Sequence, residues 1–308
     1  MSKIAFVFPG QGAQYAGMGK DFYENSSTAK AVFDQASAVT GLDIPALCFE
    51  ENENLNQTKY TQIAMVATEI AILKVLEENR IKPAVTAGLS LGEYAAIVAS
   101  GAMKQEDAFS VVQMRGTFMQ EAVPTGGGMA AVLGLDYQVI EKVLENVEGI
   151  VSIANYNCPG QTVITGEADA IARAAEPLKQ AGARRVLPLK VSGPFHSEML
   201  TGAGEKLGEV LKDVEVYDFS IPYVANLTAD YVREAKEVKP LLIKQVSSPV
   251  RFQQSIERMI GDGVDTIVEI GPGKTIAGFV KKINPTVKMI NVDKWADLEK
   301  CVEELTNA

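Results

Sequence analysis

The fold is decided by residues 85–94, which read Val85-Thr86-Ala87-Gly88-Leu89-Ser90-Leu91-Gly92-Glu93-Tyr94. A short apolar run leads into this stretch, and an apolar segment without proline or glycine (94–100) follows it. This G-x-S-x-G pattern is typical of a strand-to-helix turn so tight that glycine is needed beside the serine. The first N–H groups of the helix then face whatever the serine attacks. The pattern also occurs by chance in glycine-rich chains, so the flanking strand and helix carry the prediction that Ser90 is a nucleophile.

The bulk composition indicates a globular chain. It has 308 residues, of which 47% are hydrophobic and 22% charged, enough for one large domain or a large and a small one. No apolar run is long enough to span a bilayer, and residues 1–8 lack a signal-peptide pattern and predict a buried strand. The net charge of −10 argues against nucleic acid and anionic membrane surfaces as partners.

Three cysteines, Cys48, Cys158 and Cys301, are an odd number without metal-ligand spacing. We therefore expect free, buried thiols, a reducing cytoplasm and no metal site.

The chain has a single histidine, His196, so a serine that needs a neutral base near pH 7 has only this imidazole to use. A lone histidine is more often a structural residue than a catalyst. His196 follows a rigid Gly193-Pro194 turn, and Ser197 behind it can cap a helix that runs toward Val214. Because the chain already presents a serine turn, we interpret His196 as the candidate base.

Two other polar positions could belong to a site. Gln11 and Gln14 lie in a glycine-rich loop (9–19) after the first strand (3–8), where open α/β sheets bind ligands, although an ordinary surface turn has the same composition. Arg115 lies among apolar residues of a predicted helix (104–122). It is either a snorkelling or ion-paired side chain, or a fork that binds a carboxylate.

The middle of the chain predicts a small inserted domain. After the linker 124–128, the order strand, helix, strand, strand, helix, strand is the ferredoxin-like unit, with elements at 129–133, 137–147, 151–155, 161–166, 168–181 and 184–187. We expect this α+β domain to span 123–192, and residues 1–122 and 193–308 to form a large α/β domain with the site in the cleft between them.

The large domain is predicted from a further set of elements. Helices are expected at 20–40 (with Asp21 and Ser27 as possible caps), 61–79, 240–246, 252–260 and 295–307, and strands at 84–87, 221–225, 266–270 and 288–292. The run Gly271-Pro272-Gly273-Lys274 is similar to a phosphate-binding loop. It lacks the first glycine, and Pro272 removes an amide, so we discount it.

Six motifs, in order, resemble the malonyl-CoA:acyl carrier protein transacylases and the related acyltransferase domains of polyketide synthases. They are Pro9-Gly10-Gln11-Gly12, Gly88-x-Ser90-Leu91-Gly92-Glu93-Tyr94, Gln113-Met114-Arg115-Gly116, Asn155-x-Asn157-x-Pro159-Gly160-Gln161, Gly193-Pro194-Phe195-His196-Ser197 and Glu269-Ile270-Gly271-Pro272-Gly273. The resemblance covers nearly the whole chain. It implies a hydrolase-like α/β domain with a parallel sheet and a serine elbow, carrying a ferredoxin-like insert.

The resemblance also implies roles for single residues. Ser90 would be acylated and His196 would be its base, oriented by a backbone carbonyl near Gln245. The amides of Gln11 and Leu91 would form the oxyanion hole, and Arg115 would hold the malonyl carboxylate. The remaining implied contacts are the side chains of Gln11, Gln245 and Asn155 along the site, and Phe195, whose bulk favours malonyl over methylmalonyl. Many members have histidine where this chain has Leu89, which leaves His196 as the only candidate base.

The implied function is transfer of malonyl from malonyl-CoA to the phosphopantetheine thiol of acyl carrier protein, for fatty acid elongation, without a cofactor and by a monomer. The alternatives are a serine thioesterase or hydrolase, a trans-acting acyltransferase of polyketide synthesis, and a non-catalytic binding module. Because the chain is acidic overall, an acidic carrier needs a local basic patch. The candidates are Arg184, Arg185, Lys190, Lys281 and Lys282, which could equally be scattered solvated charges.

Overall fold

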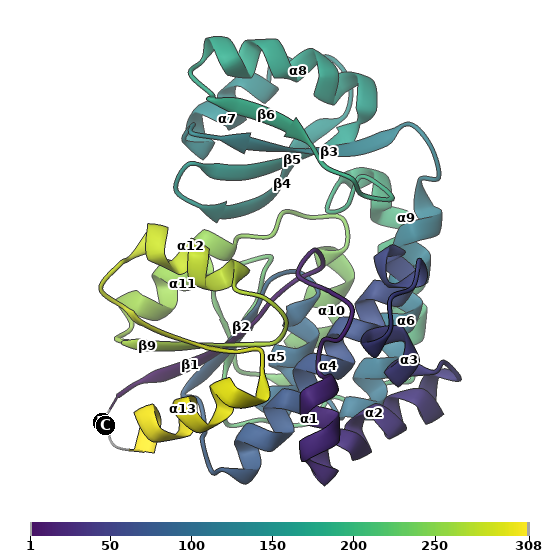
Figure 1. Cartoon of the computed structure of the whole chain (residues 1–308). Helices are drawn as coiled ribbons and strands as arrows, with labels where there is room; N and C mark the ends of the chain where they lie inside the picture. Colours follow the sequence, from purple (N-terminus) through teal and green to yellow (C-terminus); the bar gives the residue numbers. More distant parts are fainter. Residues whose placement is uncertain (1, 307–308) are drawn as a thin grey trace.

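The computed structural model describes residues 2–306 and contains two separate sheets, one above the other (Figure 1). Residue 1 and residues 307–308, which the predicted domain bounds include, lie outside the described residues, and so does the last residue of the predicted closing helix. One sheet is mostly parallel and the other antiparallel. The α/β class expected from the sequence is therefore confirmed.

The larger sheet has the order β10-β9-β1-β2-β7-β8, and every pair is parallel except β7–β8. Its strands are β1 (Ile4–Phe8), β2 (Val85–Gly88), β7 (Tyr223–Val224), β8 (Tyr231–Val232), β9 (Thr266–Ile270) and β10 (Lys288–Val292). Phe8 is in register with Gly88, so the loops that follow β1 and β2 leave the same edge of the sheet. This register brings the Gln11 loop beside the serine turn.

Helices cover both faces of this sheet, and the central strand β1 is accordingly apolar along its whole length. Successive side chains of β1 point to opposite faces: Phe6 and Phe8 enter one core, and Ala5 and Val7 enter the other. The second core is closed by α11 and α12. The helices and 3₁₀ turns of this part are α1 (Lys20–Asn25), α2 (Ser27–Thr40), α3 (Ile44–Phe49), η1 (Asn54–Asn56), α4 (Thr58–Glu78), α5 (Gly92–Ser100), α6 (Gln105–Ala122), η2 (Glu198–Leu200), α9 (Thr201–Lys212), α10 (Ala235–Gln245), α11 (Phe252–Gly261), α12 (Thr275–Ile283) and α13 (Trp295–Thr306).

The smaller sheet has the order β4-β5-β3-β6, and all its pairs are antiparallel. Its elements are β3 (Gly127–Leu133), α7 (Tyr137–Leu144), β4 (Val151–Cys158), β5 (Gln161–Glu167), α8 (Ala168–Gln180) and β6 (Arg185–Pro188). Both helices pack on one face with their own small core. The other face turns toward the larger sheet, where Asn155 forms a bridge to Val250 (Figure 1).

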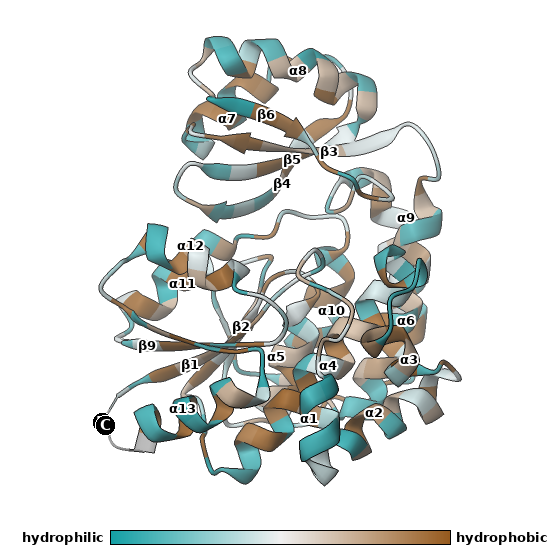
Figure 2. Cartoon of the chain, viewed as in Figure 1, coloured by the Kyte–Doolittle hydropathy of each residue, from teal (hydrophilic) through white to brown (hydrophobic). Residues whose placement is uncertain are grey.

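Apolar residues concentrate between the layers, while the outward sides of α7, α8 and α13 carry hydrophilic residues (Figure 2). The long helix α4 is apolar on nearly all sides because α2, α5 and α6 pack around it. Within residues 2–306, none of the helices combines the length and the hydrophobicity needed to cross a bilayer.

The helical prediction for 20–40 is confirmed by α1 and α2, which are separated at Ser26. The backbone at Ser26 is extended, and its side chain accepts a hydrogen bond from the Ala29 amide, which ends α1 and starts α2. Asp21 and Ser27 lie inside these helices and are not their N-caps. Ser26 instead supplies the capping oxygen.

Other elements also differ from the prediction. Helices α3 and α12 and strand β8 were not predicted, and β7 is only two residues long. Helix α10 starts at Ala235, five residues before the predicted 240, because Glu234 and Glu237 form a capping box. Ser197 caps the short η2 turn, and α9 begins four residues later and ends at Lys212.

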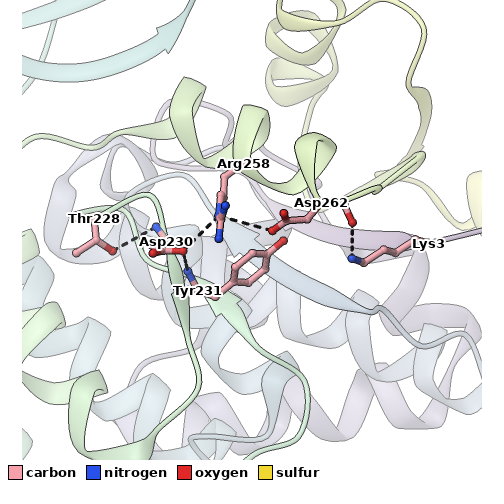
Figure 3. Close-up of polar contacts among 6 residues, drawn as sticks. All are labelled: Lys3, Thr228, Asp230, Tyr231, Arg258 and Asp262. Carbon is pink, nitrogen blue, oxygen red and sulfur yellow. Dashed lines mark hydrogen bonds and ion pairs between the residues drawn. The ribbon is translucent and has the colours of Figure 1, made fainter.

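A surface cluster fastens the β8 edge to α11 (Figure 3). Arg258 of α11 pairs with Asp230 at 3.3 Å and with Asp262 at 3.6 Å, and its guanidinium lies over the ring of Tyr231. Lys3 donates to the backbone oxygen of Asp262. The Arg258 side chain is 48% exposed, so we expect these ion pairs to contribute less than about 1 kcal/mol each.

Candidate active site

Ser90 lies at a strained turn between β2 and α5. Its φ is 54°, a left-handed value that few non-glycine residues adopt. A Cβ on Gly88 would lie 2.0 Å from the Gly92 carbonyl carbon, and a Cβ on Gly92 would lie 2.3 Å from the Phe8 oxygen. Both glycines are therefore required by close backbone approach, and the geometry is that of the predicted elbow.

Asn226 fixes this turn from the loop after β7. Its Oδ1 accepts from the Ser90 amide at 2.7 Å, and its Nδ2 donates to the Gly88 oxygen at 2.6 Å. Asn226 is fully buried. The sequence analysis did not select it, although an asparagine directly after a predicted strand at the site edge was a usable signal.

His196 also has a left-handed backbone, with φ 60°. Its Nε2 lies 2.7 Å from the Ser90 Oγ, and its Nδ1 lies 2.9 Å from the Gln245 backbone oxygen. A carbonyl oxygen only accepts, so the proton belongs on Nδ1 and the Nε2 lone pair faces the serine hydroxyl. Burial and the nearby Arg115 charge lower the pKa of His196 to about 4, which keeps the imidazole neutral near pH 7.

Arg115 is buried from solvent and points at the Ser90 hydroxyl. Its NH2 group donates a hydrogen bond to the Gln245 Oε1 at 3.0 Å, and the same nitrogen lies 3.3 Å from the Ser90 Oγ. NH1 donates to the Gln62 Oε1 at 2.8 Å. Within residues 2–306, no carboxylate lies within ion-pair distance of this guanidinium, and its Nε has no partner. A buried cation with donors to spare is built to receive an anion.

Gln245 connects these groups from the end of α10. Its backbone oxygen accepts from His196, and its side-chain oxygen accepts from Arg115. Its Nε2 donates to the Ser90 backbone oxygen at 2.8 Å and to the Glu93 Oε2 at 2.7 Å. Gln245 is not among the residues that line the cavity, contrary to the expectation that its side chain would do so. Its side chain instead bonds to Arg115, Ser90 and Glu93.

A cavity of about 400 Å³ opens above the Ser90 hydroxyl, between the two sheets. Gln11, Leu91, Asn155 and Phe195 all line it, together with Ser90, Arg115 and His196. The backbone amides of Gln11 and Leu91 donate to no acceptor in the described chain, as an oxyanion site requires. The Gln11 side chain is held by the Thr58 hydroxyl at 3.0 Å.

Sequence reasoning missed three further polar residues of this region. Gln62 orients Arg115, and Glu93 holds Gln245. Asn157 lines the cavity with a buried Oδ1 that has no partner. Gln62 and Glu93 were detectable as polar residues inside otherwise apolar helices, and Asn157 belonged to a motif already quoted.

Two other predicted regions lie outside the cavity. Arg184, Arg185 and Lys282 line a second hollow at the edge of the small sheet, whereas Lys190 and Lys281 are exposed elsewhere. At the discounted glycine run, the Glu269 carboxylate accepts from the amides of Ile276 and Ala277 at 2.9 Å. The N-terminus of α12 is thus already occupied by a side chain.

In the described part of the chain, no three His, Cys, Asp or Glu side chains gather as metal ligands would.

The comparisons with known proteins first define the class. Residues 5–292 match the model of the acyl transferase domain, so the chain is an acyltransferase. The chain is 47% identical to the malonyl CoA-acyl carrier protein transacylase of Bacillus subtilis over 99% of this chain and 98% of the relative. The chain therefore belongs to the family of malonyl CoA-acyl carrier protein transacylases.

Solved structures agree with this assignment. The transacylase of the same name from Clostridium perfringens superposes with a TM-score of 0.96 at 44% identity, covering 99% of this chain and 98% of that one. A second match is a malonyl-transacylase in complex with a type II polyketide synthase acyl-carrier protein, with a TM-score of 0.95 and 39% identity over 98% of this chain and 100% of that one.

Proposed function

We propose that this enzyme transfers a malonyl group from malonyl-CoA to the phosphopantetheine thiol of an acyl carrier protein, through a malonyl ester on Ser90. The observation that carries the proposal is the Arg115 guanidinium, which lies 3.3 Å from the Ser90 Oγ and forms no direct ion pair with a carboxylate of residues 2–306. A malonyl ester places its free carboxylate one methylene beyond the ester carbon, within reach of this cation. The names of the relatives support the same substrates.

The acyl preference follows from the charge. A malonyl carboxylate supplies the direct ion-pair partner that buried Arg115 lacks among the described residues, whereas an acetyl group leaves the guanidinium without one. Phe195 lines the same cavity, and its ring restricts space beside the acyl carbon. A methyl group changes such discrimination by only about 1–3 kcal/mol, so we propose a preference for malonyl over methylmalonyl that is not absolute.

The first half-reaction uses the Ser90–His196 pair. His196 Nε2 takes the serine proton while Oγ attacks the malonyl thioester carbonyl. The amides of Gln11 and Leu91 hold the oxyanion, and one such donor typically contributes about 10²–10³ in rate. The Gln245 oxygen holds Nδ1–H and so stabilises the imidazolium that forms. Coenzyme A then leaves with the proton from His196.

In the second half-reaction the thiol of the carrier protein attacks the ester, again with His196 as base. A thioesterase would admit water at this step. Intact mass measurement separates these functions: malonyl-CoA should add a malonyl group to Ser90, and carrier protein should remove it. Rapid release of free malonate without carrier protein would refute the transferase proposal. Malonyl transfer by a Ser90→Ala variant would refute the role of Ser90 as nucleophile.

We further propose residues 1–122 and 193–308 as a hydrolase-like domain and 123–192 as a ferredoxin-like insert. The parallel strands with the elbow after β2 support the first assignment. The strand order β4-β5-β3-β6 with two helices on one face supports the second. The carrier protein would dock near Arg184, Arg185 and Lys282, with Lys190 and Lys281 as further candidates. Charge reversal at Arg185 should weaken transfer to carrier protein more than transfer to pantetheine.

The biological setting is also a proposal. All three cysteines are free and buried, which supports a reducing cytoplasm. We propose a monomer that works without a metal or cofactor and has no nucleic-acid or membrane partner. We place it in fatty acid elongation. Both fatty acid and polyketide carrier proteins should be tested as acceptors, because one matched structure contains a polyketide carrier.

A further inference from the structure

Glu93 is a buried carboxyl group of the site, and the acyl transfer described above does not use its charge. It lies in the first turn of α5, three residues after the nucleophile, and is 1% exposed. Only one of its oxygens is used: Oε2 accepts from Gln245 Nε2 at 2.7 Å and from the Asn226 amide at 3.3 Å. Oε1 accepts no hydrogen bond from the described residues. A proton on Oε1 would therefore leave both hydrogen bonds intact.

Arg115 is the charged group that Glu93 faces. The two side chains bind opposite ends of the Gln245 amide, since Arg115 NH2 donates to Oε1 and Glu93 Oε2 accepts from Nε2. The other titratable neighbours are Tyr94 on α5 and Tyr223 on β7, whose pKa values are raised by burial, and His196, which is neutral. The buried charge is thus zero when Glu93 is ionised and +1 when it is protonated.

A substrate carboxylate changes this balance. Paired with Arg115, it makes the total −1 if Glu93 stays ionised and zero if Glu93 is protonated. An excess charge in a buried site is costly, so the empty site favours ionised Glu93 and the site with a bound carboxylate favours protonated Glu93. Burial already raises the pKa of Glu93 to about 7, against the opposing effect of Gln245, Asn226 and Arg115. Either state is therefore accessible near neutral pH.

We propose that Glu93 is the internal counter-ion of Arg115 and takes up a proton from solvent, on Oε1, when a substrate carboxylate pairs with Arg115. This inference rests on the proposed function, because it requires an acyl group with a free carboxylate. In the empty site, ionised Glu93 balances the charge of Arg115. In the acylated site, the substrate carboxylate balances that charge and Glu93 is protonated. Glu93 acts through Arg115, whose charge it balances, and is therefore a positioning residue.

The first test needs no variant. With malonyl-CoA, kcat/KM of the wild-type enzyme should fall about tenfold as pH rises through about 7, if the carboxylate raises the pKa of Glu93 by about one unit. With acetyl-CoA the same profile should be flat between about pH 6 and 8.5, since no carboxylate arrives. Equal profiles for the two acyl groups would overturn the inference.

The second test measures the proton directly. Acylation of Ser90 by malonyl-CoA in weak buffer with a pH indicator should take up about half a proton per site near pH 7.5. Acetyl-CoA should cause no uptake. Malonylation of Ser90, seen by mass, without proton uptake would refute the counter-ion role and leave the proposed function standing, whereas absence of malonylation would refute the proposed function itself.

Glu93→Gln isolates the charge, because one carbonyl oxygen can accept both hydrogen bonds that now reach Oε2. Its malonyl-CoA profile should be flat and remain at the low-pH level of the wild type, with no proton uptake. Glu69→Gln is the matched control. Glu69 on α4 is fully buried without a hydrogen-bond partner and outside the site, and burial raises its pKa well above the usual value. This variant should keep the wild-type profile. A Glu93→Gln enzyme that retains the wild-type pH dependence would contradict the inference.

Discussion

Replacement of Arg115 by methionine should abolish the preference for a dicarboxylic acyl group. Methionine fills much of the same space without charge, so the Ser90–His196 pair at 2.7 Å should persist. The guanidinium is buried and lacks a carboxylate partner, so a malonyl carboxylate bound there would form a desolvated ion pair. Removing one partner of such a pair typically costs about 3–5 kcal/mol. This corresponds to a loss of roughly 10²–10⁴ in kcat/KM for malonyl-CoA.

Acetyl-CoA provides the internal reference for this variant, because its acyl group makes no ion pair. Acylation of Ser90 should be followed in single turnovers by intact mass, with each thioester in turn. The malonyl-to-acetyl ratio should fall roughly 10²–10⁴-fold. Arg115→Lys is the control for charge alone and should lose less, because an ammonium keeps the attraction and loses the bidentate geometry. A ratio that changes less than about threefold in Arg115→Met would refute the role of Arg115 in acyl selection.

Three further predictions concern the turn and the base. Asn226→Ala removes the side chain that bonds the Ser90 amide and the Gly88 oxygen, so the free energy of unfolding should fall by about 1–3 kcal/mol and kcat should fall more than KM changes. Denaturant melts and steady-state kinetics measure these effects, and an unchanged kcat would contradict the prediction. Gly92→Ala places a Cβ 2.3 Å from the Phe8 oxygen and should give no folded protein at 37 °C, whereas Gly261→Ala, at a position with open space, should fold normally in the same melt. Because His196 has its pKa lowered to about 4, activity with acetyl-CoA, which leaves Glu93 out of the profile, should fall on the acid side only below about pH 5. The unfolded chain should bind the extra proton first, so stability is lost as pH falls from about 6.5 to 4. Loss of acetyl-CoA activity on the acid side with a pKa near 6.5 would contradict the buried neutral imidazole.

Local sequence patterns were sufficient to predict the structure wherever a short stretch determines its own backbone geometry. The elbow followed from Gly88 and Gly92, since the contacts that exclude a Cβ there involve the turn itself and the adjacent strand β1. The small sheet followed from alternating apolar residues and turn signals along 129–187. The break at Ser26 was missed because either neighbouring serine could have capped the helix, and the extended backbone that decides between them is not visible in composition.

Interactions between distant residues were beyond this reasoning. Arg115 could be read as an ion-paired surface side chain until α4 and α10 brought Gln62 and Gln245 against it and left it without a carboxylate. Asn226 and Glu93 became site residues only through partners more than a hundred positions away. The contacts of the Gln245 side chain with Arg115, Ser90 and Glu93 likewise join residues far apart in the chain, and Gln245 is not among the residues of the cavity wall.

The sequence by itself determined the candidate nucleophile, the one available imidazole and the order of elements that carries them, because these depend on residue type and on spacing along the chain. Only the tertiary structure decided which lone pair faces the serine, which cation is unpaired, and which buried carboxyl group faces that cation. These properties depend on distance and desolvation, and both arise when the parallel strands align their carboxyl ends and the helices exclude water from the groups placed there.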